Sequence, residues 1–115
     1  MATVAISKQF MNLNAGNQLT LTSVGAGDTF TLDYTGADYK TALLIVNSSA
    51  ASDIVIEDTD SYNEGIADLT YTVAANKTAL IVLDSGYYKK TSGDSKGKVV
   101  GTASKACSMA LVELP

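Results

Sequence analysis

The sequence predicts an all-β protein, a single β-sandwich of the jelly-roll type with eight to nine short antiparallel strands and an extended N-terminal arm. At 115 residues the chain has room for one domain with one core. Apolar residues alternate with threonine-rich polar residues at period two, which is the pattern of half-buried strands. Glycine, asparagine and aspartate interrupt this pattern about every ten residues, and the only proline is the last residue. Strands at this spacing are typical of a sandwich or small barrel.

The N-terminal segment, residues 1–10, is expected to be an arm or a first strand, and residues 11–115 are expected to form the single domain. Val4 and Ile6 alternate with smaller or polar neighbours, as in a short strand. The arm is apolar enough to add a strand to a neighbouring molecule, so Val4, Ile6 and Phe10 are candidate contact residues. We also expect the domain to fold without this arm.

The remaining strands follow in order along the chain. Residues 18–22 and 28–34 alternate and flank a Gly-Ala-Gly turn, which predicts a hairpin with one wet face. Residues 41–46 and 78–83 are nearly continuous apolar runs, which indicates central strands covered on both sides or strands covered by a neighbouring subunit. The other expected strands lie at 53–57, 69–73, 98–102 and 105–114.

Composition excludes most catalytic chemistry. The chain has no histidine, arginine or tryptophan and a single cysteine, Cys107. No Ser-His triad can be assembled, and no histidine is present to activate the thiol, so we expect no enzyme and no cofactor. The formal net charge of −4 also argues against nucleic-acid and anionic-membrane partners, since both attract lysine and arginine.

An acidic run is the densest cluster of polar residues. Glu57, Asp58, Asp60, Glu64 and Asp68 stand within twelve residues. Calcium prefers such oxygen ligands, and Asp58, Asp60 and Glu64 would be the ligands of choice. The spacing departs from that of an EF-hand loop, so a solvated acidic loop without metal is the favoured interpretation.

A basic run follows later in the chain. Four of the eight lysines, Lys89, Lys90, Lys96 and Lys98, lie within ten residues. One interpretation is a hairpin tip kept soluble by charge. The other pairs these lysines with the acidic run of a second subunit, which would close a head-to-tail ring, most simply a homotrimer.

The run from Asp28 to Asn47, together with the segments 83–89 and 96–99, resembles small virion structural proteins of tailed bacteriophages and prophages, in particular head decoration (cement) proteins. The resemblance implies a β-rich module that binds the major capsid protein on the outer surface of the capsid and stabilises the shell. It implies no catalytic residues. The N-terminus carries no secretory signal pattern, so the chain would be made in the host cytoplasm and end in the virion.

Two alternatives remain open from the sequence. A tail, baseplate or fibre module of a phage would also be acidic, β-rich and oligomeric. A carbohydrate-binding or calcium-binding adhesion domain would instead use the acidic loop with Tyr62, Tyr87 and Tyr88.

Overall fold

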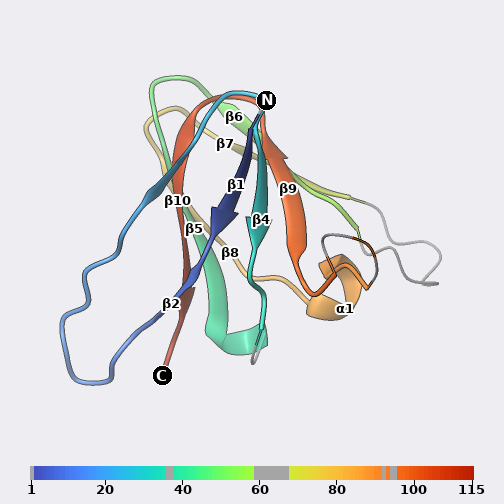
Figure 1. Cartoon of the computed structure of the whole chain (residues 1–115). Coiled ribbons are helices and arrows are strands. Elements are labelled where there is room, and N and C mark those ends of the chain that lie inside the picture. Colours follow the sequence, from blue (N-terminus) through green and yellow to red (C-terminus); the bar gives the residue numbers. More distant parts are fainter. Residues whose placement is uncertain (1, 36–37, 59–67, 92, 94–95) are drawn as a thin grey trace.

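The computed structural model describes residues 2–35, 38–58, 68–91, 93 and 96–115, and in them ten strands form two packed sheets (Figure 1). Sheet A has the strand order β1-β4-β9-β6-β7. Sheet B has the order β2-β10-β5-β8, and β3 also pairs with β10. The strands are β1 (Thr3–Ile6), β2 (Lys8–Phe10), β3 (Thr22–Val24), β4 (Thr29–Leu32), β5 (Thr41–Asn47), β6 (Ser52–Ile56), β7 (Leu69–Val73), β8 (Thr78–Ile81), β9 (Val99–Ala103) and β10 (Cys107–Glu113).

Strands β3 to β10 have the topology of a jelly roll. The first of these strands pairs with the last, the second with the second-last, and so on to the middle. This gives the antiparallel pairs β3–β10, β4–β9, β5–β8 and β6–β7. Two further antiparallel pairs, β10–β5 and β6–β9, join these ladders into two four-stranded sheets. This arrangement confirms the predicted fold class, because nested pairs wrapped into two sheets define the jelly roll.

The N-terminal segment adds one strand to each sheet. Val4 lies beside Phe30 in a parallel β1–β4 pair, and Gln9 lies beside Val112 in a parallel β2–β10 pair. Ser7, between the two strands, is where the chain passes from sheet A to sheet B. Both sheets are therefore mixed, whereas the sequence pattern indicated only antiparallel strands.

The predicted hairpin of residues 18–22 and 28–34 is wrong. β3 begins only at Thr22 and pairs with β10, and β4 pairs with β1 and β9 in the other sheet. The glycine turn instead carries the chain between the sheets, with Gly27 at a φ of 78° and the Asp28 carboxylate accepting from the Gly25 amide at 3.1 Å. Period-two alternation specifies the buried face of a strand and says nothing about its partner.

The two apolar runs have different positions. β5 lies between β10 and β8, which confirms that it is a central strand. Its outward residues Ala42, Leu44 and Val46 are only half-buried, so within one chain its outer face is not covered. β8 is an edge strand, and the side chains of Leu80 and Val82 are 64% and 61% exposed. Within one chain, the prediction of a strand covered on both of its faces is therefore wrong for β8.

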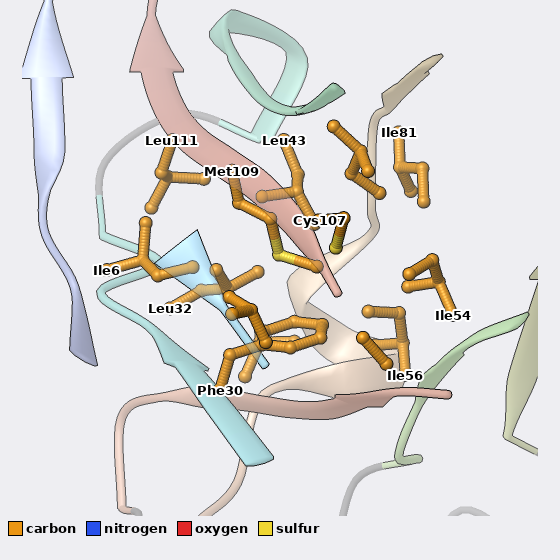
Figure 2. Close-up of a cluster of buried hydrophobic side chains, with 14 of the residues drawn as sticks. Ile6, Phe30, Leu32, Leu43, Ile54, Ile56, Ile81, Cys107, Met109 and Leu111 are labelled. Carbon is orange, nitrogen blue, oxygen red and sulfur yellow. The ribbon is translucent and has the colours of Figure 1, made fainter. Parts of the chain in front are cut away.

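The core lies between the sheets (Figure 2). Inward residues of sheet B, such as Leu43, Met109 and Leu111, face Phe30 and Ile54 of sheet A. Polar side chains close two ends of this core. The Tyr34 hydroxyl bonds the backbone N–H and C=O of Leu83 at 3.1 and 3.0 Å. The Asn47 amide nitrogen donates to the carbonyls of Ala50, Val73 and Ala74.

In the described residues, helical structure is limited to two short segments, the 3-10 turn η1 (Asp38–Lys40) and α1 (Ser85–Tyr88). No helix in the described part of the chain has the length and apolar character needed to cross a membrane.

Candidate interaction surfaces

The candidate metal ligands are only partly placed. Asp60 and Glu64 lie outside the described residues, as does Tyr62. The Asp58 amide donates to the Asp68 carboxylate at 2.8 Å. Among the described residues there is no group of three or more histidine, cysteine, aspartate or glutamate side chains arranged to hold a metal ion.

The basic run contacts the acidic run within the same chain. Lys90 Nζ lies 3.3 Å from Glu57 Oε1 and donates to the Asp58 carbonyl at 2.8 Å. The head-to-tail ring required the two runs to lie on opposite flanks of the subunit, and this contact places their described ends side by side. Lys90 therefore no longer supports the charge argument for a ring, and the homotrimer stays a prediction.

The other lysines of the basic run have separate environments. Lys89 is half-buried and forms a backbone bridge with Val99. The Lys98 carbonyl accepts from the Lys90 amide at 2.9 Å, and Lys96 is exposed. These backbone bonds join the two ends of the run as a hairpin, so its position is set by pairing along the chain.

The contact residues predicted in the N-terminal arm differ in how exposed they are. Ile6 is 2% exposed within the core, and Val4 is half-buried against it. Phe10 is 66% exposed, with Lys8 Nζ 5.3 Å from the centre of its ring. Of the three predicted contact residues, Phe10 is therefore the one whose side chain is available to a partner.

An ion pair that sequence reasoning missed holds the arm in place. The Lys8 side chain is 6% exposed, and its Nζ lies 3.0 Å from Glu113 Oε1. The same ammonium donates to the hydroxyl and the carbonyl of Thr35. The partners are 27 and 105 residues away in sequence, so no local pattern could have indicated the contact.

The outer faces of the two sheets differ sharply in polarity. Because side chains alternate along a strand, the residues between the core positions point away from the sandwich. On sheet B, β5, β8 and β10 present an almost continuous apolar surface, which we call the apolar face. Its exposed members are Leu80 and Val82, and Ala42, Leu44 and Val46 are half-buried. Ala110 and Val112 share this face by register but are buried, and Thr78 and Ser108 border it.

The outer face of sheet A, the threonine face, is far more polar. Its outward positions carry six threonines with Asp53, and only Ala5, Val55 and Val100 are apolar; the threonines are Thr3, Thr29, Thr31, Thr70, Thr72 and Thr102. A protein whose two sheets both faced water would need no such difference. Exposed apolar patches mark interaction sites, and this face carries the exposed Leu80 and Val82 beside the half-buried Leu44, so the apolar face is the best candidate contact surface.

One end of the apolar face is hollowed. A shallow hollow of about 320 Å³ lies over the β3–β10–β5 end of sheet B, where the small outward side chains Ser23 and Ser108 stand beside Val46. The register puts Ser108 between the other two residues. The hollow can receive an apolar side chain from another molecule and offers hydroxyl groups at its edge.

The lone cysteine does not contribute to a reactive site. Cys107 is 6% exposed at the start of β10, and desolvation by burial raises the pKa of its thiol. A neutral buried thiol is a poor nucleophile.

The tyrosine pair considered for sugar binding lies in α1. The rings of Tyr87 and Tyr88 are 6.3 Å apart at an interplanar angle of 72°. This edge-to-face arrangement does not form a flat two-ring platform.

Comparison of the chain with protein-family models, curated proteins and solved structures finds no match.

Proposed function

We propose that this chain is a non-enzymatic structural protein of a tailed-phage virion, which binds the outer surface of the capsid and stabilises the shell. The observation that carries the proposal is the contrast between the two sheet faces. The apolar face has the composition of a surface that spends its life covered, and the threonine face that of a surface left in water. The proposal joins this contrast to the sequence resemblance to head decoration proteins.

Charge and rigidity support the same role. The net charge of −4 suits a surface that faces away from packaged DNA. A two-sheet jelly roll holds its loops on paired strands, so a repeated contact can be made at every equivalent lattice position. Many modest contacts on a lattice then sum to firm attachment.

In this proposal the apolar face rests on the major capsid protein. Phe10 adds a second apolar contact from the arm. The chain would lie on the virion surface after release from the host cytoplasm.

The direct test is immunogold electron microscopy of particles sedimented from the source bacterium after DNA-damage induction, with antibody to this chain. Gold over heads supports capsid decoration. Gold restricted to tails would make the chain a tail, baseplate or fibre module, and unlabelled particles would overturn the virion assignment.

A further inference from the structure

We propose that two copies of this chain pair through the edge of β8, antiparallel and about a two-fold axis at Leu80. β8 has β5 as its neighbour on one side, and the described chain places no strand on the other. The partner is a second copy of the same chain, and the result is one continuous sheet to which each copy contributes the five strands of sheet B, ten in all. This inference does not depend on where in a virion the protein lies.

The backbone of β8 has hydrogen-bonding groups directed to the open edge. The Asn47 amide donates to the Lys77 carbonyl at 3.0 Å, just before β8 begins. In an antiparallel ladder every second residue directs both its N–H and its C=O to the same neighbour. Lys77, Ala79 and Ile81 therefore face β5. The backbone groups of Thr78, Leu80 and Val82 face the open edge.

The edge sequence is self-complementary. With Leu80 on the axis, Thr78 of each copy lies opposite Val82 of the other, and Leu80 lies opposite itself. All three positions are hydrogen-bonded pairs in this register, which gives about six bonds between the copies. The two apolar faces then join without a break, because the exposed side chain of Leu80 contacts its counterpart at the axis and the exposed side chain of Val82 contacts Thr78 of the other copy.

Although β8 is short, its edge carries no charge, proline or bulge that would prevent such pairing. Natural edge strands are protected by charged residues, proline or bulges. The run from Thr78 to Leu83 contains no charged residue and no proline, and its ladder with β5 is continuous from Thr78 to Ile81.

Charge at the two ends of the edge fits an antiparallel partner. Lys77 precedes β8 and Asp84 follows the apolar run, and both residues are exposed. Antiparallel pairing brings the lysine end of each copy to the aspartate end of the other. A parallel arrangement would bring like charges together.

Pairing also covers a groove on this flank. Leu69 and Tyr71 of β7, with Leu80, Ile81 and Val82, line an apolar groove of about 310 Å³. Tyr71 is 48% exposed there. A contact restricted to one strand edge and its groove is smaller than a standard interface, which buries about 1,600 Å², so we expect a dimer that forms only at higher concentration.

Sedimentation equilibrium over a wide range of concentration tests the pairing. We expect the wild-type chain to move between monomer and dimer, and Leu80→Lys to weaken dimerisation at least 100-fold, because two ammonium groups would meet at the axis. Thr70→Lys is the matched control, since Thr70 is an exposed residue on the outer face of β7, an edge strand of sheet A. The control should dimerise normally. A wild-type monomer at every concentration, a trimer, or equal losses in both variants would overturn the proposal.

A cysteine variant tests the register without introducing charge. Leu80→Cys should form an intermolecular disulfide under mild oxidation, since directly paired strand residues fall within disulfide reach. Thr70→Cys should stay monomeric on a non-reducing gel, and the buried Cys107 should not cross-link in either variant. Absence of the Leu80→Cys cross-link, or cross-linking of Thr70→Cys to the same extent, would contradict pairing at β8.

Discussion

Lys8 and Glu113 form an ion pair of 3.0 Å that fastens the N-terminal arm to the end of β10. The Lys8 side chain is 6% exposed and that of Glu113 17% exposed, so the pair is largely shielded from water. Thr35 supplies two further oxygen acceptors to the ammonium. A charge so enclosed is stable only while its partners are present.

Glu113→Gln should therefore lower the free energy of unfolding by about 2–3 kcal/mol, because Lys8 would keep a buried charge without a counter-ion. Lys8→Met should cost less, about 1 kcal/mol, because the apolar stem is kept and Glu113 is the more exposed partner. Urea unfolding measures both. Lys96→Met, at an exposed lysine, is the control, and equal effects in all three variants would contradict the account.

The Lys90–Glu57 contact predicts a different result. Glu57 is 42% exposed, so solvent screens the pair and Lys90→Glu should cost about 1 kcal/mol or less. The double change Lys90→Glu with Glu57→Lys should recover most of that loss in a double-mutant cycle. Sedimentation should show an unchanged oligomeric state. A loss of assembly specific to Lys90→Glu would instead support the prediction that the basic run contacts a second subunit.

The arm combines a structural residue and an exposed one. Ile6→Ala should lower stability by about 2–4 kcal/mol, because its side chain lies in the core. Phe10→Ala should change stability by about 0.5 kcal/mol or less, and in the proposed function it should reduce binding to capsids. Thermal unfolding and co-sedimentation with particles separate the two effects. Deleting residues 1–10 would remove both residues together, so the point variants are the sharper test.

Gly101 on β9 is required by the ring of Phe30. A Cβ at this position would lie 2.5 Å from Phe30 Cζ and 2.8 Å from the Val55 carbonyl oxygen. Gly101→Ala should therefore cost about 1–3 kcal/mol through overpacking. Gly16→Ala is the control, because nothing lies within 4 Å of its added Cβ. Similar melting temperatures for both variants would show that the ring can move aside.

The buried thiol predicts slow modification and a pH effect. Cys107 should react with an alkylating reagent at the rate of unfolding, and quickly in denaturant.

Burial raises the pKa of the Cys107 thiol, so at alkaline pH the folded state retains the thiol proton while the unfolded state loses it. The free energy of unfolding should therefore fall as pH rises above about 8.5. Cys107→Ser should remove this component of the alkaline slope in urea titrations. An unchanged alkaline slope in the Cys107→Ser variant would contradict a contribution from the buried thiol.

The sequence was sufficient for the fold class but not for the pairing of strands. Alternation identified the inward side chains of β4, β6 and β10, because burial depends on which face a residue occupies. It could not show that β3 and β4 lie in different sheets, since both a hairpin and a crossover follow a glycine turn. The parallel pairing of the arm was also invisible, because Val4 and Ile6 have the same pattern in either direction.

The candidate contacts were predicted only in part. Clustered lysines suggested contacts between subunits, and Lys90 instead pairs within the chain, which only the nearness of β9 to β6 reveals. The apolar run at 78–83 did contain the relevant signal. One of its two interpretations was a strand covered by a neighbouring subunit, and β8 lies at an open edge where such a partner can bind.

The central claim is that the apolar face binds another surface while the threonine face stays in water. Leu44→Glu and Thr31→Glu place the same charge at half-buried positions on opposite faces. Co-sedimentation of each folded variant with phage heads that lack the protein compares the two faces directly. The account predicts that wild type and Thr31→Glu bind and Leu44→Glu does not. Equal binding by both variants would contradict it.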